Sequence, residues 1–430
     1  MARDQVQVIR HVAASPEAVW AIARDFCGAW HPAITTIRAE RDGRGALIRA
    51  FQAAGEDTLY REELTWFSDS DRTIGYRHLE GIADVEAYDA HMAVEPGENG
   101  GSTIRWTAAV TAPEPRLSAI CAGTGAVFEA GIEALDRRAH AGDWPVPAAA
   151  RPAPVATEDL ILDGTPDLAL TVTPGESPTL CLFLHGIGGA RWNWLPQLGA
   201  AGAVMRAAAL DLRGYGGSAL GPAASTVEDY CADILRIRSA LGAEKLVLAG
   251  LSYGSWIATS FAMRHPELMA GLVLSGGCTG MSEAGVEERE AFRRSRQVPL
   301  DAGQTPADFA PAVVQVLAGP DAPAGIREQL LASMAAIPAA TYRDALNCFT
   351  HPPERFDFSR LSMPVLMMTG AYDRLASPAE IRGVAGRIHA EAPMPDVRYE
   401  TIADAGHVCN VERPDAYNAI LLDFLGKLPR

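Results

Sequence analysis

Basic clusters and long apolar runs are both missing from this sequence. It contains no lysine-rich run, and its formal net charge is −16 at pH 7. Binding to nucleic-acid phosphates needs a basic face, so we expect no nucleic-acid partner. The opening residues, MARDQVQVIRHV, lack the apolar core of a signal peptide, and no stretch reaches the roughly eighteen apolar residues of a membrane span. We therefore expect a cytoplasmic protein with no membrane partner.

Cysteine is also scarce, and its placement argues against two kinds of site. The seven cysteines are odd in number and scattered, which is typical of reduced thiols rather than of a disulfide framework. No pair has the spacing of a metal site, and the glycine-rich stretch DLRGYGGS lacks the lysine of a phosphate-binding loop. The sequence thus predicts no metal and no nucleotide cofactor.

One segment with four closely spaced prolines marks a domain boundary. Residues 139–160, AHAGDWPVPAAARPAPVATEDL, hold four prolines. Each proline fixes φ and removes a backbone donor, so a helix or strand does not easily continue through the segment. A chain of 430 residues, 48% of them hydrophobic, is also too long for one ordinary core. We expect a first domain at 1–140, a linker at 141–157 and a second domain at 158–430.

The first domain has the pattern of an antiparallel sheet closed by a long helix. QVQVIRHV alternates as a strand, SPEAVWAIARDF begins with a serine N-cap, and PRLSAICAGTGAVFEAGIEALDRRA has helical spacing. Turns rich in Gly, Asp and Asn separate the remaining segments. The pattern predicts an α+β helix-grip fold. Its further strands are predicted at 46–53, 57–67, 72–78, 84–94 and 102–112.

Together with the phrase DFCGAWHPAI at 25–34, this layout resembles the START/Bet v1-like superfamily, also called SRPBCC or polyketide cyclase-like. The resemblance implies a cavity between the sheet and the long helix that binds an apolar ligand. Asp25, His31 and His91 are the suggestive titratable groups, and isolated groups of this kind favour capping and packing over catalysis. The domain could instead serve for docking, for dimerisation into a homodimer, or as an independent enzyme.

In the second domain, short apolar segments alternate with helical ones, which predicts a mainly parallel α/β sheet. TVEDYCADILRIRSALG and SWIATSFAMRHPEL have the helical period. Further helical segments at about 279–360 predict a cap inserted over the site. Buried parallel strands are expected to be apolar throughout. By that criterion the strands are 180–184, 205–211, 245–250, 271–275, 364–369 and 397–402.

One turn in this domain has the pattern of a nucleophile. LAGLSYGSW, at 248–256, carries G-x-S-x-G between a predicted strand and a predicted helix. A nucleophile elbow needs glycine two residues before and two after the serine, because strand and helix approach closely there. The N-terminus of the helix also favours a developing negative charge. We predict that Ser252 is the nucleophile.

A serine hydroxyl needs a base to take its proton and a third group to hold the base. LMMTGAYDRLASP places Asp373 after an apolar strand, and IADAGHVCNVERP places His407 after the last strand. The order Ser, Asp, His is the one expected for such a fold, and loops at the carboxyl ends of parallel strands gather at one edge. We predict Asp373 and His407 as the partners of Ser252.

An oxyanion site needs two donors, and the loop HGIGG supplies a candidate. One donor is predicted to be the amide of Tyr253, directly after the nucleophile. The other is assigned to the amide of Ile187, with Gly188 as the alternative. Trp192 and Trp194, which follow this loop, are candidates for the cavity entrance or for ordinary packing.

HGIGG, DLRGYGGS, GLSYGS, the Asp373 loop and GHVCNVERPDAYN together resemble the α/β-hydrolase superfamily over about 158–430. The closing phrase AGHVCNVERPDAYNAILLDFL is most similar to that of 3-oxoadipate enol-lactonases. The resemblance implies a cofactor-free serine hydrolase with a helical cap, acting on a small-molecule carboxylic ester or lactone. No basic residue stands out as the binder of a substrate carboxylate, since Arg191 and Arg213 are near the loops in sequence alone.

Three alternatives to an ester or lactone hydrolase stay open. The same triad could hydrolyse a C–C bond in a ring-fission product. It could also carry out perhydrolysis of the haloperoxidase type. A protein of a different class, a non-catalytic fusion protein that binds a hydrophobic ligand, would be expected to carry a broken triad or a blocked oxyanion loop.

Overall fold

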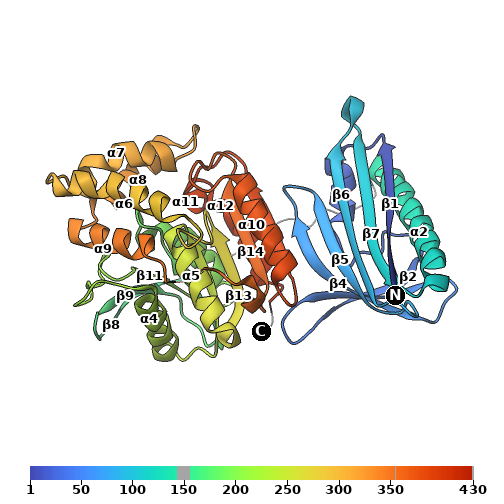
Figure 1. Ribbon diagram of the computed structural model, residues 1–430, viewed down its shortest axis with the longest axis horizontal. Coiled ribbons are helices and arrows are strands. Elements are labelled where there is room, and N and C mark those ends of the chain that lie inside the picture. The colour runs from blue at the N-terminus through green and yellow to red at the C-terminus, as the bar shows by residue number, and fades with distance from the viewer. Residues whose placement is uncertain (143–154, 354, 429–430) are drawn as a thin grey trace. The chain divides into compact units, whose positions relative to one another are not determined.

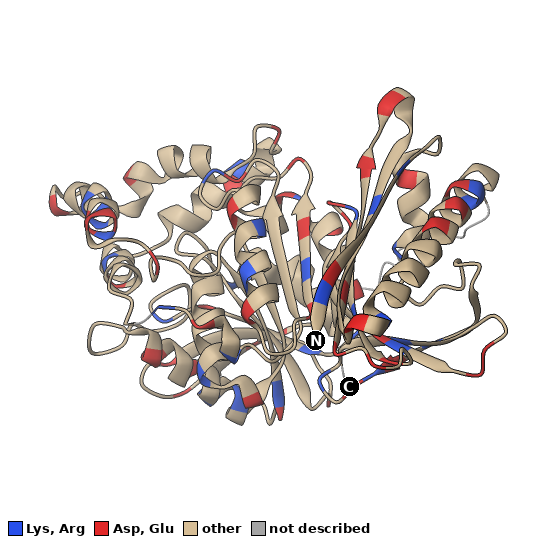
Figure 2. Ribbon diagram, turned by 45° about the vertical axis from the view of Figure 1, so that its right-hand side comes forward, with Lys and Arg blue, Asp and Glu red and all other residues tan. Residues whose placement is uncertain are grey.

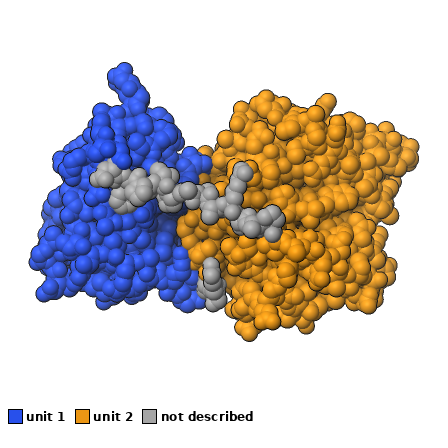
Figure 3. All heavy atoms as spheres, turned by 180° about the vertical axis from the view of Figure 1, so that it is seen from behind, with its two compact units in different colours: residues 1–149, 395–399 blue, residues 150–394, 400–430 orange. Residues whose placement is uncertain are grey.

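The computed structural model describes residues 1–142, 155–353 and 355–428. The chain divides into two compact units, one of residues 1–149 and 395–399, the other of residues 150–394 and 400–430 (Figure 3). Most of the predicted proline-rich linker, residues 143–154, lies outside the described residues.

The first unit is an antiparallel sheet with one long helix against it (Figure 1). Its strands follow the order β1-β7-β6-β5-β4-β3-β2, and each neighbouring pair is antiparallel. The predicted helix-grip fold is confirmed. The elements are β1 (Ala2–Val12), α1 (Pro16–Ala23), β2 (Ile34–Arg41), β3 (Leu47–Ala53), β4 (Leu59–Ser68), β5 (Thr73–Glu80), β6 (Ala87–Pro96), β7 (Ser102–Ala112) and α2 (Glu114–Ala141).

The start of α1 and strand β7 follow simple local rules, and strand β2 does not. Ser15 caps α1, since its side chain accepts from the amide of Ala18, and Pro16 occupies the first helical turn. Strand β7 alternates strictly between buried and half-buried residues. Strand β2 was not predicted, because this outer strand is largely polar and has no buried face.

Helix α2 lies on the sheet closely enough to require glycine at one point. A Cβ on Gly131 would lie 2.7 Å from the Trp106 ring and 2.8 Å from the His31 ring, and Trp106 stacks on Phe128 at 4.4 Å. His31 is buried there, with Nε2 bonded to the carbonyl of Val127 and Nδ1 to the amide of Ala33, which is a packing role. By length and composition, α2 is the one helix in the described part of the chain that could span a membrane.

The second unit is built on the sheet order β15-β14-β13-β12-β10-β11-β9-β8, although the first three residues of β15, 397–399, are counted with the first unit. The strands from β11 through β10, β12 and β13 to β14 are parallel, whereas β9 and β8 continue the edge as antiparallel strands. This mainly parallel sheet confirms the predicted α/β class. The strands are β8 (Glu158–Leu162), β9 (Leu168–Val172), β10 (Thr179–Leu184), β11 (Arg206–Leu210), β12 (Lys245–Leu251), β13 (Met269–Ser275), β14 (Val365–Gly370) and β15 (Val397–Ile402).

Helices cover this sheet and extend beyond it. Helix α5 packs against β12 and β13, α10 against β14, and α3 against β11. Four helices, α6 to α9, lie between β13 and β14 in the chain, at the position of the expected cap. The helices are α3 (Leu195–Gly202), α4 (Val227–Ala240), α5 (Tyr253–Arg264), α6 (Val286–Asp301), α7 (Pro306–Leu317), α8 (Ala324–Ala335), α9 (Ala339–Thr350), α10 (Pro378–Glu391), α11 (Cys409–Glu412) and α12 (Pro414–Leu425).

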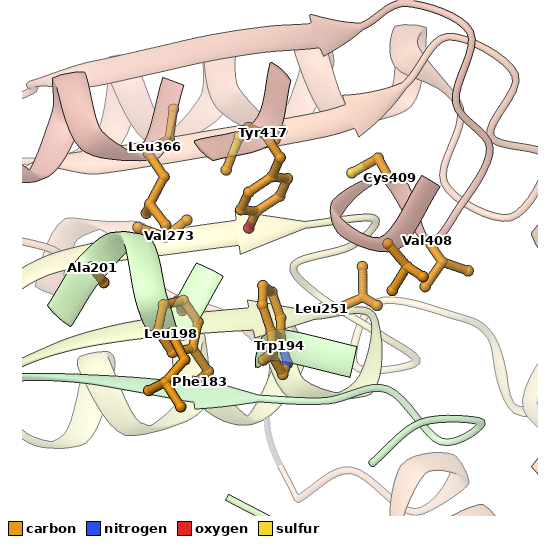
Figure 4. Packing of buried hydrophobic residues seen from close by; sticks show 14 of the residues in the cluster. Phe183, Trp194, Leu198, Ala201, Leu251, Val273, Leu366, Val408, Cys409 and Tyr417 are labelled. Carbon is orange, nitrogen blue, oxygen red and sulfur yellow. The ribbon is translucent and has the colours of Figure 1, made fainter. Parts of the chain in front are cut away.

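Charged residues of both signs are interspersed along the described ribbon (Figure 2). Helix α6 is an example, since its first turns are acidic and its middle is basic. The second unit has a buried hydrophobic cluster that includes Phe183, Leu198, Val273 and Tyr417 (Figure 4).

Candidate active site

Ser252 lies in a sharp turn between β12 and α5. Its φ of 55° and ψ of −114° belong to a backbone conformation that residues with a Cβ rarely adopt. The flanking glycines are required by space: a Cβ on Gly250 would overlap the backbone of Gly254, and a Cβ on Gly254 would overlap the carbonyl of Leu184. The G-x-S-x-G pattern therefore has a physical cause here, because strand and helix touch through these two positions.

Asp373 and His407 are brought together by loops that follow β14 and β15. Nδ1 of His407 lies 2.9 Å from Oδ2 of Asp373, and both side chains are buried. The other carboxylate oxygen of Asp373 accepts the amides of Leu375 and Ala376, at 2.8 and 2.9 Å. An ionised carboxylate only accepts hydrogen bonds, so the proton of the neutral imidazole resides on Nδ1 and Nε2 is left as a base.

The pKa of Asp373 is set by two opposing effects. Burial acts to raise the pKa. The hydrogen bond and charge of His407 and the two loop amides act to lower it, and their combined effect is larger, so the pKa falls below its usual value of 3.8. The carboxylate therefore stays ionised beside the imidazole. This is the state in which it can hold one tautomer and stabilise an imidazolium.

Ser252 and His407 line the same cavity, of about 640 Å³. A second pair of glycines, directly after β13, lies against both residues. A Cβ on Gly276 would lie 3.1 Å from the His407 ring, and a Cβ on Gly277 would lie 3.5 Å from Cα of Ser252. Both glycines have positive φ, so the SGG sequence after a predicted strand was an available signal for this close approach.

The two residues predicted as oxyanion donors also line this cavity. Tyr253 begins α5, so its amide has no acceptor within the helix, and Ile187 belongs to the HGIGG loop after β10. The loop approaches the serine directly, because a Cβ on Gly186 would lie 3.3 Å from Cβ of Ser252. Gly188, the alternative donor, lies in the same lining.

His185 holds the HGIGG loop in place, a role that the sequence did not suggest. Its Nε2 accepts the amide of Leu212 at 3.0 Å, and Nδ1 contacts the carbonyl of Gly186 at 2.8 Å. Burial lowers the pKa of this imidazole, which favours the neutral form that the two bonds require. His185 thus ties the HGIGG loop to the DLRGYGGS loop.

Glu412 is a second positioning residue that the sequence did not reveal. Its buried carboxylate accepts the amides of Gly319, at 2.8 Å, and Gly406, at 2.9 Å. The amide of His407 donates to the carbonyl of Leu317 at 2.7 Å. The His407 loop is therefore anchored to the end of α7. Burial raises the pKa of the Glu412 carboxyl, and the two amides oppose that rise.

The predicted role of the two tryptophans at the cavity entrance needs correction. Trp194 is fully buried in the core beside Phe183 and Tyr417 (Figure 4), and neither Trp192 nor Trp194 is among the residues that line the described cavity. Trp192 instead donates from Nε1 to the hydroxyl of Ser333 on α8, at 2.8 Å. A large indole next to a site loop packs as readily into a core as into a pocket, and the sequence does not distinguish these.

Arg191 and Arg213 are committed to ion pairs elsewhere. Arg191 pairs with the buried Asp211, and Arg213 pairs with Asp233 at 2.9 Å. Neither arginine lines the described cavity. In the described ranges, no group of three or more His, Cys, Asp or Glu side chains is arranged to hold a metal ion.

The cap supplies most of the remaining cavity wall, and it is apolar. Phe292 of α6, Val313 of α7, Met334 of α8 and Phe349 of α9 are examples. Charged side chains in the lining are few: Glu288 and Arg296 come from α6, and Glu380 comes from α10. The cavity thus suits a mostly apolar molecule that carries few charges.

The comparisons with known proteins agree with this geometry. Residues 181–420 match the family model described as "Alpha/beta hydrolase family", and residues 3–140 match "Polyketide cyclase / dehydrase and lipid transport". "Putative carbamate hydrolase RutD" of Escherichia coli O157:H7 is 26% identical over 278 residues, which cover 61% of this chain and 96% of the relative.

Solved structures with the same fold include two hydrolases. A thermophilic esterase from Thermogutta terrifontis superposes with a TM-score of 0.55 and 25% identity, covering 65% of this chain and 99% of the esterase. The enol-lactonase from Burkholderia xenovorans LB400 superposes with a TM-score of 0.51 and 22% identity, covering 61% of this chain and 97% of the lactonase. The lactonase match is evidence for the fold alone.

Proposed function

Since this chain belongs to the alpha/beta hydrolase family, we propose that it is a cofactor-free serine hydrolase that cleaves a carboxylic ester or lactone through an acyl-enzyme. One observation carries the proposal: the hydrogen-bonded pair of Asp373 and His407 meets the same cavity as Ser252, which sits in a strained turn. The esterase from Thermogutta terrifontis supports the choice of ester chemistry.

In the proposed reaction, Nε2 of His407 takes the proton of Ser252 as Oγ attacks the substrate carbonyl. The amides of Tyr253 and Ile187 donate to the oxyanion of the tetrahedral intermediate. The imidazolium, stabilised by Asp373, then gives its proton to the leaving alkoxide. Water attacks the acyl-enzyme with His407 as base, and the carboxylic acid leaves as Ser252 regains its proton.

The name of the Escherichia coli relative adds a second candidate, hydrolysis of a carbamate. A carbamate carbonyl can be attacked by the same serine, with an amine or alcohol as the leaving group. For this reason the substrate panel should pair aryl esters and lactones with aryl carbamates. A vinylogous 1,5-diketone in the same panel tests C–C bond hydrolysis.

Intact mass after reaction with a fluorophosphonate tests the nucleophile. We expect one adduct on the natural chain and on Ser239→Ala, which changes an exposed serine of α4, and none on Ser252→Ala. A folded natural chain without an adduct would count against an activated serine. An adduct that persists on Ser252→Ala would assign the reactive group elsewhere.

For the first unit, we propose binding of an apolar ligand, which the words "lipid transport" in its family description support. Fluorescent fatty acid titrated into the full chain tests this. Competition by a covalent inhibitor of Ser252 separates the two units: displacement would locate the fatty acid in the hydrolase cavity and overturn the proposal for the first unit.

A further inference from the structure

The apolar cavity contains one strongly basic side chain. Arg296 is the single arginine or lysine among the described residues that line it. Four other residues of α6 also line the cavity and follow helical spacing: Glu288, Phe292, Ser295 and Pro299. The guanidinium therefore belongs to the same wall as the apolar cap residues.

Neighbouring arginines of α6 are paired with a carboxylate, and Arg296 is not. Arg293 and Arg294 both contact Glu290, at 2.7 and 3.3 Å. Within the described residues, no carboxylate lies within ion-pair distance of Arg296. Glu290 thus serves both neighbouring arginines, and Arg296, which lines the cavity, is left without a carboxylate in contact.

The groups that do contact Arg296 are neutral. Its Nη1 donates to the carbonyl of Phe292, at 3.2 Å, and to the hydroxyl of Ser295, at 2.9 Å. The guanidinium carbon lies 3.5 Å from the centre of the Phe292 ring, and the phenol of Tyr342 is a further partner. A guanidinium has five N–H donors, so these bonds leave some for a bound anion. A half-buried cation without a counter-ion is costly, which argues that a ligand supplies the negative charge.

Negative charge in the lining lies away from Arg296. Glu288 precedes Arg296 by eight residues, which is about 12 Å along a helix. Glu380 lies in the first turn of α10, which directly follows the Asp373 loop, and burial together with the charges of Asp373 and Glu288 raises its pKa. The cavity therefore has an acidic side near the Asp373–His407 pair and a basic side at Arg296.

We propose that Arg296 binds the carboxylate of an elongated substrate whose ester or lactone carbonyl reaches Ser252. The inference rests on the proposed hydrolase function and narrows its substrate class to compounds with a free carboxylate several carbons from the scissile carbonyl. Glu288 and Glu380, the two carboxylates of the lining, repel the substrate carboxylate from the other end of the cavity. The charges therefore select one orientation of the substrate.

Matched ester pairs test this assignment. Mono(4-nitrophenyl) esters of hexane-, heptane- and octanedioic acid are compared with the neutral diesters in which the free carboxylate is methylated. Release of nitrophenol from each ester is measured with four proteins: the natural chain, Arg296→Gln, Arg296→Lys and the control Arg294→Gln. We expect the natural chain to prefer at least one of the anionic esters. Arg296→Gln should lower kcat/KM for that ester about 10- to 100-fold and for the neutral ester less than threefold. Arg296→Lys should keep part of the preference, and Arg294→Gln all of it.

The outcomes separate the two proposals. Equal kcat/KM for the anionic and neutral esters, or an equal loss for both in Arg296→Gln, overturns the role of Arg296 and leaves the hydrolase standing. If the chain cleaves no ester and Ser252 is not labelled, the hydrolase proposal fails. Calorimetry with heptanedioate then decides the role of Arg296. Weaker binding by Arg296→Gln than by the natural chain supports that role. Equal binding by the two proteins, or no binding by the natural chain, overturns it.

Discussion

Both units bury a charged pair, and the surroundings of the two pairs differ. In the first unit, Arg49 donates to Glu62 at 2.6 Å, and its guanidinium carbon lies 4.5 Å from the ring of Phe26 and 4.6 Å from the ring of Tyr76. The pair is enclosed by aromatic side chains. In the second unit, the pair of Asp373 and His407 borders a cavity that also reaches Ser252.

Burial of charge does not by itself mark a site. Burial acts to lower the pKa of Arg49, but the charge and hydrogen bond of Glu62, together with Tyr76 and Cys27, more than offset it, so that the pKa is raised. Burial likewise opposes ionisation of Asp373, and His407 together with the amides of Leu375 and Ala376 more than offsets that effect. What separates the two pairs is open space beside a nucleophile, which is a property of the packing around the pair.

Asp373→Asn should give the largest effect. The neutral amide does not stabilise an imidazolium and permits the wrong tautomer, so kcat on an aryl ester should fall about 10³- to 10⁴-fold. Steady-state kinetics on the folded variant measures this. Replacing the other pair, by Arg49→Met with Glu62→Leu, should leave kcat within about twofold of the natural value. A matching loss in that double variant would mean that the first pair also serves catalysis.

Glu62→Ala should mainly affect stability. It leaves the Arg49 guanidinium buried without a counter-ion, which is expected to cost about 3–5 kcal/mol in the free energy of unfolding. Denaturant unfolding followed by tryptophan fluorescence measures this. The double variant of both residues should cost less than Glu62→Ala alone, because it leaves no orphaned charge. A single variant as stable as the natural chain would show that water reaches Arg49.

Gly131→Ala should have a smaller cost in the first unit. Its Cβ would press on the rings of Trp106 and His31, and side chains can shift, so we expect a loss of about 1–3 kcal/mol. Gly123→Ala in the same helix is the matched control, since its Cβ would meet nothing within 4 Å. That variant should gain up to about 1 kcal/mol from helix propensity. Equal melting temperatures for both variants would contradict the close approach of helix and sheet.

The smallest expected effect is the pH dependence of the Asp373 contribution. Its pKa is lowered in the folded state, so its stabilisation is fully present above the usual value of 3.8 and is lost as the pH falls through the lower folded pKa. The difference in unfolding free energy between the natural chain and Asp373→Asn should therefore shrink from pH 6 to pH 3. A difference that grows on acidification would reverse the assigned direction.

The elements that sequence reasoning found share a strong local pattern. The strand at 245–250 and the helix after Ser252 were predicted because an apolar run and a helical period flank a glycine-bounded turn, and the structure places β12 and α5 there. Strands β2 and β8 were missed because exposed edge strands lack a buried face to set the alternation. Strand β9 was also missed, although all five of its residues are buried.

For the site, sequence spacing predicted which loops carry Ser252, Asp373 and His407, because a nucleophile turn and the carboxyl ends of strands are local features. The position of Arg296 was beyond that reasoning. The role proposed for Arg296 depends on which side of α6 faces the cavity, and on the fact that Glu290 pairs with Arg293 rather than with Arg296. The position of Trp194 was also not predictable from the sequence, since a core and an apolar pocket are equally suitable surroundings for an indole.

By itself, the sequence determined the two fold classes, the elbow around Ser252 and the order of the groups that follow it, since these depend on hydrophobic periodicity and on the steric demands of glycine. Tertiary structure alone decided that Asp373 and His407 lie 2.9 Å apart, that Glu412 anchors the His407 loop, and that Arg296 faces the cavity without a carboxylate. These facts depend on contacts between residues far apart in the chain, and such contacts are set by the packing of whole elements rather than by any local pattern.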